Sequence, residues 1–330
     1  MSRTYKATGI NLKSMPMGES DRLLTILTRE FGLIRAVAMG SRKHNSRLGG
    51  RSELFVVNDL LIAKGRSLDK VAQAETLESY PRLGQDLKKL IASQYLAELC
   101  LGQALSDQPQ EELFCLLNEH LGRLERSPAS QVLPLLTHAV FQLLILAGVA
   151  PQVHVCCITR QALALDYTNC DWRIGFSIPA GGTVTLASLE RLIASHPSPR
   201  QRQGVASTAA SIARQVVPAS SPPSTSLHPT GEPNQTSSHS PRLHPAGLNP
   251  VGLNMRLNAA ELMLLQQLAA VELPTPSQLL AQLQTSMAPH NTLESVWQSV
   301  ERTLRFYAQY HLDRPIRSAA FIDACFDTID

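Results

Sequence analysis

Apolar and polar residues alternate over most of the first 80 positions, in five short runs separated by turn residues. The runs are Thr4 to Met15, Asp21 to Thr28, Leu33 to Met39, Leu54 to Ala63 and Val71 to Thr76. Such alternation predicts half-buried strands. The second run is also compatible with a helix capped by Ser20, but Phe31-Gly32 follows at hairpin distance and favours a strand pair. Five short strands with one long loop predict a small closed Greek-key barrel.

The apolar period changes from two to 3.6 residues after the barrel. Three amphipathic or apolar helices are expected at Asp86 to Leu105, Glu111 to Arg126 and Val132 to Leu146. The third is apolar on nearly all sides, so it should be the central helix of a helical domain. Two more helices are expected at Met255 to Val271 and Thr292 to His311, the latter opened by Asn291 with Glu294 as a capping pair. The fold class is therefore α+β.

These patterns divide the chain into four segments. They are a barrel at 1–80, a helical domain at 81–196, an insertion at 197–253 and completing helices at 254–330. The insertion is rich in Pro, Ser, Thr and Gln and has no Phe, Trp or Tyr. Such a composition cannot bury enough apolar surface to offset the entropy of ordering, so we expect a disordered, tolerated loop. A partner-binding tail is the alternative.

Charge is unevenly distributed, although the net charge is only +3. Residues 1–70 hold 13 Lys and Arg against 6 Asp and Glu, whereas the remainder holds 17 against 21. Ser41 to Ser52 is bracketed by glycines and contains no acidic residue. A basic front and a mildly acidic back predict an anionic partner for the front alone.

Phosphate binding requires several cations that reach a polyanion together. The candidate DNA-binding residues are Arg22, Arg35, Arg42, Lys43, Arg47, Arg51, Lys64 and Arg66. A merely solvated loop is the alternative, and Arg22 could pair with Asp21 or Glu19 instead. Aromatic residues are sparse here: Phe55 is expected in the core, while Tyr5 and Phe31 are candidate stacking platforms. We therefore expect phosphate-dominated binding of single and double strands.

No sequence motif points to catalysis. The chain has no Gly-x-x-x-x-Gly-Lys-Ser/Thr loop, no Gly-x-Ser-x-Gly elbow and no His-Glu-x-x-His pair, so no catalytic residue is expected. Six cysteines form no disulfide framework and no signal peptide is recognised, which predicts a cytoplasmic protein. The expected DNA binding would make it nucleoid-associated. Val132 to Val149 is the most apolar stretch, but Pro134, His138 and Gln142 favour a buried helix over a membrane span.

Several short motifs resemble one family in their order and spacing. They are Gly18-Glu19-Ser20-Asp21-Arg22, Leu27-Thr28-Arg29-Glu30-Phe31-Gly32, Gly40-Ser41-Arg42, Ser46-Arg47-Leu48, Leu304-Arg305-Phe306-Tyr307 and Arg314-Pro315-Ile316-Arg317-Ser318. Over about 1–195 and 254–325 the chain resembles the RecO family of bacterial recombination mediators. The resemblance implies an OB-fold followed by helices. It also implies DNA binding and strand annealing, and loading of RecA recombinase, with RecR, onto strands coated by single-strand-binding protein in the RecF pathway.

The family often carries a zinc site made of two Cys-x-x-Cys pairs, and the resemblance places a degenerate form of this site in a lobe at about 151–188 of the helical domain. In the matching register this chain has Cys156, but Thr159, Thr185 and Ser188 stand at the other three positions. Zinc needs about four Cys or His ligands in a tetrahedron, so no metal or other cofactor is expected. A substitute set of His154, Cys157 and Cys170 with Cys156 is the alternative.

The resemblance also implies a receptor for the acidic, apolar tail of single-strand-binding protein. Such a receptor should be an apolar groove with a basic rim. The last long helix offers Trp297 and Tyr307 beside Arg302 and Arg305, although Trp297 could simply be a core residue. The main hypothesis is a non-enzymatic DNA-annealing mediator of recombinational repair. The alternative is a helical adaptor whose barrel binds RNA or protein.

Overall fold

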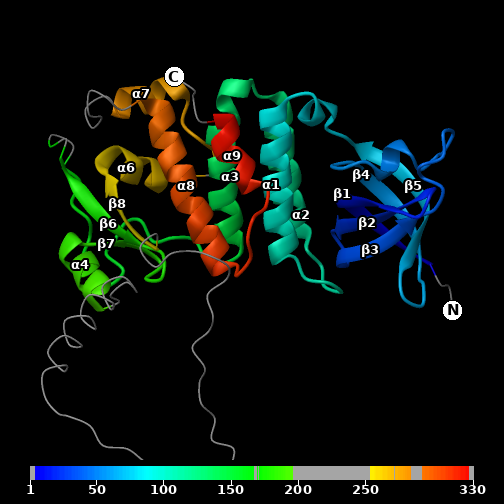
Figure 1. Ribbon diagram of the computed structural model, residues 1–330, viewed down its shortest axis with the longest axis horizontal. Helices are drawn as coiled ribbons and strands as arrows, with labels where there is room; N and C mark the ends of the chain where they lie inside the picture. The colour runs from blue at the N-terminus through cyan, green and yellow to red at the C-terminus, as the bar shows by residue number, and fades with distance from the viewer. Residues whose placement is uncertain are drawn as a thin grey trace, which may run out of the picture.

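The computed structural model describes residues 4–166, 169, 171–195, 253–270, 272–283 and 292–326. A β-barrel and a small β lobe lie at opposite ends of an elongated molecule, with a set of helices between them (Figure 1). The insertion predicted at 197–253 lies outside the described residues except for its last residue, Leu253.

Five strands form the N-terminal barrel. They are β1 (Thr4–Met17), β2 (Asp21–Thr28), β3 (Gly32–Ala38), β4 (Val57–Ala63) and β5 (Asp69–Glu78). The sheet closes in the order β1-β2-β3-β5-β4, with every pair antiparallel except β3 and β5. Alternate residues such as Leu24, Ile26 and Ile62 fill its interior. The predicted closed barrel is confirmed, and the ambiguous run at 21–28 is a strand.

The helical part is built around one apolar helix. A short 3-10 turn, η2 (Pro81–Gly84), leads into α1 (Leu87–Gln103), α2 (Glu111–Arg126) and α3 (Val132–Leu146), and the C-terminal region adds α8 (Leu293–His311) and α9 (Ala319–Phe326). Helix α3 packs against α1, α2 and α8. The stretch Ala129–Leu146, which includes the 3-10 turn η3 (Ala129–Gln131), is long and apolar enough to cross a membrane. These contacts make it a core helix, as predicted.

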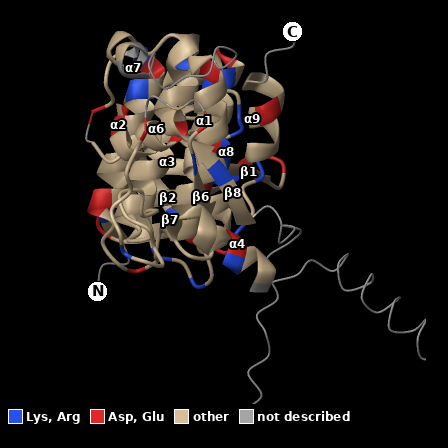
Figure 2. Ribbon diagram, turned by 90° about the vertical axis from the view of Figure 1, so that its left-hand side faces the viewer, with Lys and Arg blue, Asp and Glu red and all other residues tan. Residues whose placement is uncertain are grey.

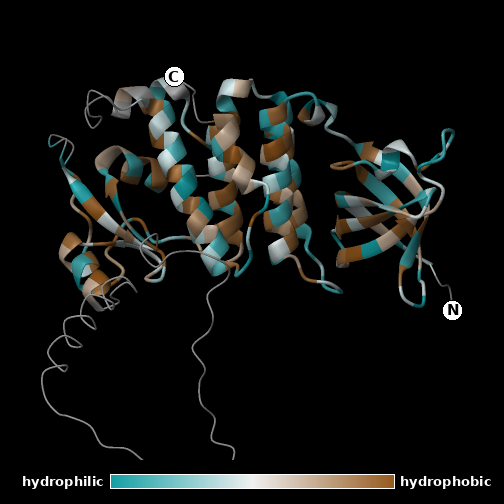
Figure 3. Cartoon of the chain, viewed as in Figure 1, coloured by the Kyte–Doolittle hydropathy of each residue, from teal (hydrophilic) through white to brown (hydrophobic). Residues whose placement is uncertain are grey.

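Barrel and helices share one hydrophobic core. Ile10, Leu12 and Leu27 of the barrel belong to the same buried cluster as Tyr95 of α1 and Phe141 of α3. Backbone bonds tie the parts together as well: the Leu33 N–H donates to Leu105 at 2.9 Å, and the Gln110 N–H donates to Arg29 at 2.9 Å. Figure 3 shows hydrophobic residues on the barrel strands as well as on the helices, whereas outer loops of the barrel are hydrophilic. The barrel is therefore fixed against the helical part.

The β lobe corrects one sequence-based prediction. Strands β6 (Arg173–Ser177), β7 (Gly182–Val184) and β8 (Asn254–Asn258) form a sheet in the order β7-β6-β8, flanked by α4 (Leu186–Ser195). The helix expected from Met255 begins only at α6 (Ala259–Gln267), because residues 254–258 pair with β6 instead. The Asn258 side chain and Glu261 then form a capping box that starts the helix.

A similar shift occurs at the last long helix. The observed capping box of α8 uses Thr292 and Ser295 rather than the expected Asn291 and Glu294. Helix α7 (Pro276–Leu283) lies between α6 and α8 in the chain. Both corrections move an element boundary by one to four residues and leave the predicted helices in place.

Candidate nucleic-acid interface

The basic loop, Ser41–Ser52, is held against the barrel by hydrogen bonds to its backbone. Its start is fixed by the Arg42 N–H, which donates to the Ser20 carbonyl at 2.9 Å. Its end is fixed by Asn11, whose Nδ2 donates to the Arg51 carbonyl at 2.8 Å and to the Glu53 carbonyl at 2.9 Å. Asn58 Nδ2 donates to the same Arg51 carbonyl at 3.0 Å. Both ends of the basic loop are therefore fixed to the barrel by hydrogen bonds.

Four cationic side chains of the basic loop remain without acidic partners. Arg42, Lys43 and Arg47 are exposed, and Arg51 is half-buried. Arg42 Nη1 donates to the Gly18 carbonyl at 3.0 Å, and Arg51 Nη1 donates to the Arg47 carbonyl at 2.8 Å. No ion pair between described residues involves any of the four. Their charge is therefore free to interact with a polyanion.

The other four predicted cations lie outside the basic loop and differ in their surroundings. Arg22 forms an ion pair with Glu53 at 2.5 Å, so its charge is compensated, and its partner is neither Asp21 nor Glu19. Arg35 is exposed on β3, and Lys64 and Arg66 are exposed in the turn between β4 and β5.

Because β3 and β5 pair in parallel at Ala36 and Asp69, the β4–β5 turn leads into the sheet beside the strand that carries Arg35. Among the described residues no hydrogen bond or ion pair connects Arg35, Lys64 or Arg66 to the basic loop. The exposed candidate cations of the barrel thus belong to two parts of the chain, the basic loop and the region of β3 with the β4–β5 turn, and the charge of Arg22 is compensated by Glu53.

The aromatic residues of the barrel have different environments. Phe55 is 3% exposed and lies in the core, as predicted. Tyr5 and Phe31 are half-buried and meet edge to face, with ring centroids 4.8 Å apart. The Tyr5 hydroxyl donates to Asp69 at 2.6 Å, and burial together with this carboxylate raises the pKa of Tyr5. Base stacking on the Tyr5–Phe31 pair stays a prediction.

Sequence reasoning missed the two asparagines that hold the basic loop. Asn11 and Asn58 are both fully buried, in strands whose inward positions are otherwise apolar. A buried amide must find hydrogen-bond partners, and here those partners are loop carbonyls. The sequence feature that could have identified them is an asparagine at an inward position of a strand that lies close to a long loop.

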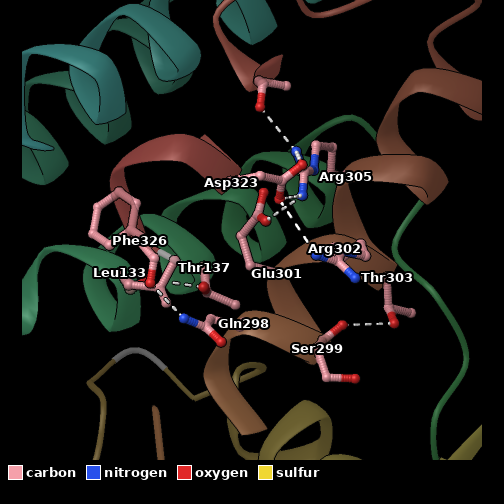
Figure 4. Close-up of polar contacts among 11 residues, drawn as sticks. Leu133, Thr137, Gln298, Ser299, Glu301, Arg302, Thr303, Arg305, Asp323 and Phe326 are labelled. Atoms are coloured by element: carbon pink, nitrogen blue, oxygen red, sulfur yellow. Dashed lines mark hydrogen bonds and ion pairs between the residues drawn. The ribbon is translucent and has the colours of Figure 1, made fainter. Parts of the chain in front are cut away.

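The predicted partner-binding residues do not form one exposed surface. Trp297 and Tyr307 are 3% and 2% exposed, so the interpretation of Trp297 as core is confirmed. Arg305 is also buried, with Nη2 lying 3.1 Å from Glu301 and 2.6 Å from Asp323 (Figure 4). Only Arg302 is largely exposed, at 3.6 Å from Asp323. Arg305 therefore anchors α9 to α8 and cannot form a basic rim.

The charges around this cluster affect its ionisation. Burial raises the pKa of Glu301 to about 7, although Arg305 opposes this shift. Hydrogen bonds from Arg305 lower the pKa of Asp323. Figure 2 shows basic and acidic segments interspersed on the helical part when it is viewed from the lobe side.

An apolar cavity lies beside this cluster. Its volume is about 540 Å³, and its lining includes Leu133, Leu279, Leu293, Trp297, Phe326 and Lys88. The Lys88 ammonium lies 4.9 Å from the centroid of the Phe326 ring. Trp297 is thus a core residue that also forms part of a cavity wall, with a cation close by.

The region of the family's zinc site has a different chemistry here. Cys156 is buried, and its Sγ accepts the N–H groups of Thr159 and Thr185, each at 3.4 Å. The Thr185 hydroxyl donates to Ser188 Oγ at 2.9 Å. No group of three or more His, Cys, Asp or Glu side chains able to hold a metal occurs among the described residues. One thiol and three hydroxyl side chains do not fit zinc.

The same hydrogen bonds control the Cys156 thiol. Burial alone would raise its pKa, but the hydrogen bonds from Thr159, Thr185 and Ile158 outweigh burial and lower the pKa to about 7. Cys170, a member of the alternative metal set, lies outside the described residues.

Comparison with known proteins agrees with this architecture. The family model for the N-terminal part of recombination protein O matches residues 1–80, and the C-terminal model matches residues 84–190. DNA repair protein RecO of Nostoc sp. strain PCC 7120 is 52% identical over 99% of this chain and 97% of its own length. RecO of Cyanothece sp. strain PCC 7425 is 52% identical over 100% and 98%, and RecO of Gloeobacter violaceus is 38% identical over 99% and 95%. The chain therefore belongs to the RecO family of DNA repair proteins.

Proposed function

We propose that the chain binds single- and double-stranded DNA through the basic loop and anneals complementary strands. With RecR, it would help to load RecA recombinase onto DNA coated by single-strand-binding protein. The observation that carries this proposal is the set of four cations without acidic partners on a loop whose backbone is held by two buried asparagines. A DNA repair role also accounts for the expected cytoplasmic, nucleoid-associated location.

Annealing follows from electrostatics. Two strands repel each other through their phosphates, and a cationic surface that touches both strands reduces that repulsion. No residue has to act as an acid, a base or a nucleophile. The proposal therefore needs no catalytic residue and no nucleotide-binding loop.

The test is the combined replacement of Arg42, Lys43, Arg47 and Arg51 by alanine. For single strands, we expect the slope of log affinity against log salt to fall by about 0.7 for each phosphate that the variant no longer neutralises. Annealing of complementary oligonucleotides should slow in parallel. Replacing Arg191 and Arg256, which are exposed on the lobe, by alanine controls for removal of positive charge elsewhere. Unchanged affinity in the fourfold variant would remove the basis of the proposal.

The second group of cations can be tested in the same assay. Replacing Arg35, Lys64 and Arg66 by alanine should weaken binding less than the fourfold variant, because these three cations belong to β3 and the β4–β5 turn and not to the proposed binding loop. An adaptor that binds RNA or protein is the competing function. Such an adaptor would not accelerate annealing in any of these measurements.

For the tail of single-strand-binding protein, the apolar cavity beside Trp297 is the better candidate than an Arg305 rim. It combines apolar walls with the Lys88 cation, which suits an acidic, apolar peptide. Replacing Lys88 by glutamate should weaken binding of a peptide with that composition. The same change at Lys70, which is exposed on the barrel, should have no effect. Equal weakening in both variants would argue against the cavity.

A further inference from the structure

A groove of about 430 Å³ runs between the barrel and the helical part. It is lined by residues of β1, of α1 and of the segment that connects α8 to α9. Because barrel and helices share one core, this groove is already formed in the protein without a ligand.

Three cations line the groove. Lys13, Arg314 and Arg317 are exposed, and none of their cationic groups has a hydrogen-bond or ion-pair partner among the described residues. Among the described residues, Glu98 is the only carboxylate in the lining, and it accepts the Arg317 N–H at 2.6 Å and the Ser318 N–H at 3.3 Å. The carboxylate therefore fixes the backbone of the connecting segment, while the three cations are free for an anionic ligand.

The floor of the groove is apolar. Leu12 and Ile316 contribute from the core, at 4% and 7% exposed, and Leu54 and Leu101 are half-buried beside them. A ligand that combines phosphates with planar, weakly polar groups would match both the cations and this floor.

The groove begins where the basic loop ends. Leu54 lines the groove and stands two residues after Ser52, the last residue of the loop. Lys13 stands two residues after Asn11, whose side chain holds the Arg51 and Glu53 carbonyls. The basic loop and the groove are thus adjacent, and the one carboxylate between Ser52 and Leu54, that of Glu53, is paired with Arg22.

We propose that this groove binds a single-stranded segment of the DNA that leaves the basic loop. Lys13, Arg314 and Arg317 contact its phosphates, and its sugars or unpaired bases lie on the apolar floor. A duplex keeps its bases stacked and paired inside, so it cannot use that floor. The groove therefore makes binding selective for single strands. This inference rests on the proposed DNA binding by the basic loop.

Two variants probe the groove. The first replaces Lys13, Arg314 and Arg317 by alanine. The second replaces Gly102 by glutamate, because a Cβ at Gly102 meets only Arg314 Cδ, at 3.8 Å, so a carboxylate fits beside that arginine. The matched control is Gly84→Glu, where a Cβ meets no atom within 4 Å and which lies outside the groove.

Affinity for a thymidine oligonucleotide and for a duplex of equal length is measured against salt for the full chain. We expect the triple variant to lower the single-strand slope by about 2, since each neutralised phosphate contributes about 0.7. Duplex affinity should be unchanged. Gly102→Glu should weaken single-strand binding, and Gly84→Glu should not. The thermal unfolding midpoint of each variant verifies that it is folded.

Several results would overturn the inference. If the triple variant binds single strands like the parent while the fourfold loop variant does not, the groove is not part of the DNA path and the proposed function stands. Equal weakening for single strands and duplex would refute strand selectivity. Weaker binding of an acidic peptide with DNA affinity intact would assign the groove to a protein partner instead. If neither the loop nor the groove variant changes DNA affinity, the proposed function itself fails.

Discussion

At the scale of single residues, the buried amides of Asn11 and Asn58 decide where the positive charge of this protein lies. The cationic side chains of the loop and the apolar side chains of the strands cannot fix the loop backbone alone. The two side-chain amides do so by donating three hydrogen bonds to the carbonyls of Arg51 and Glu53. The end of the basic loop thus depends on two buried residues, in addition to the hydrogen bonds that Arg42 and Arg51 donate to the Gly18 and Arg47 carbonyls.

Replacing Asn11 by leucine removes two of these hydrogen bonds. The Arg51 carbonyl keeps Asn58 Nδ2 as a donor, while the Glu53 carbonyl loses its side-chain donor, so we expect the free energy of unfolding to fall by about 0.5–1.5 kcal/mol, the net value of one hydrogen bond. DNA affinity should fall as well, because the loop is no longer positioned. Denaturant unfolding and oligonucleotide binding measure the two effects. Asn45→Leu, at an exposed loop position, is the control and should stay within about 0.5 kcal/mol.

His120 is a second residue whose environment has a measurable consequence. It is 2% exposed, its ring centroid lies 5.5 Å from that of His138, and neither ring nitrogen has a hydrogen-bond partner among the described residues. Burial, His138 and Arg123 lower the pKa of His120 to about 3. The folded protein therefore keeps this imidazole neutral, whereas the unfolded chain binds a proton below its ordinary pKa of about 6.5.

The sign of the pH effect follows from this difference. Stability falls as the pH decreases from about 6.5 toward 3, because only the unfolded state gains the proton. Between pH 7 and pH 5 this contribution is about 2 kcal/mol. We measure the free energy of unfolding of His120→Leu minus that of the parent protein at each pH. This difference should be about 2 kcal/mol more favourable to the variant at pH 5 than at pH 7. Comparing the two proteins at each pH cancels other groups, such as Glu301, whose raised pKa acts in the opposite direction. An equal pH dependence in both proteins would contradict the expectation.

At the scale of secondary-structure elements, hydrogen bonds to the Cys156 sulfur join two segments of the β lobe. The Cys156 sulfur accepts N–H groups from two separate segments, one at Thr159 and one at Thr185. The Thr185–Ser188 bond closes the second segment. These hydrogen bonds bring together Cys156, Thr159, Thr185 and Ser188, the four positions at which the resemblance implies zinc ligands.

We expect the parent protein to be purified without zinc, and the combined variant Thr159→Cys, Thr185→Cys and Ser188→Cys to bind zinc stoichiometrically. The reason is that the variant supplies four thiols around one point, which is a complete tetrahedral set. Metal analysis and thermal unfolding with and without chelator give the readout. Cys115→Ser, at an exposed site, is the control. Stoichiometric zinc in the parent protein would show that another ligand set exists.

At the scale of the whole molecule, the shared core couples the barrel to the helices. Leu27 of β2 lies in the core cluster that also contains Trp297, whereas Leu24 of the same strand belongs to the separate barrel interior. Both tryptophans, Trp172 and Trp297, lie outside the barrel. Tryptophan fluorescence therefore reports the unfolding of the helical part and the lobe.

We expect Leu27→Ala and Leu24→Ala each to lower the free energy of unfolding by about 2–5 kcal/mol. If barrel and helices unfold together, both variants lower the midpoint seen by tryptophan fluorescence, although neither changes a residue near a tryptophan. Circular dichroism provides the second probe. If the unfolding midpoint seen by circular dichroism shifts while the midpoint seen by tryptophan fluorescence stays at the parent value, the barrel and the helical part unfold as two independent units.

Local periodicity was sufficient to predict the five strands of the barrel and the positions of α1, α2 and α3. It was sufficient because each of these elements buries a face defined by its own residues. The same sequence also predicted the basic loop, whose cations need no partner, and the core position of Phe55. The family followed from the order of short motifs.

Interactions between distant segments decided what periodicity could not. The apolar pattern predicted a helix from Met255, but residues 254–258 pair with β6 as a strand. Glu53 neutralises Arg22, Asp323 and Glu301 enclose Arg305, and Asn11 positions the loop. The groove exists only because β1, α1 and the segment after α8 meet in space. Hydrogen bonds and ion pairs between residues far apart in sequence have no periodic signature, so only the folded chain reveals which of its charges are paired and which remain free.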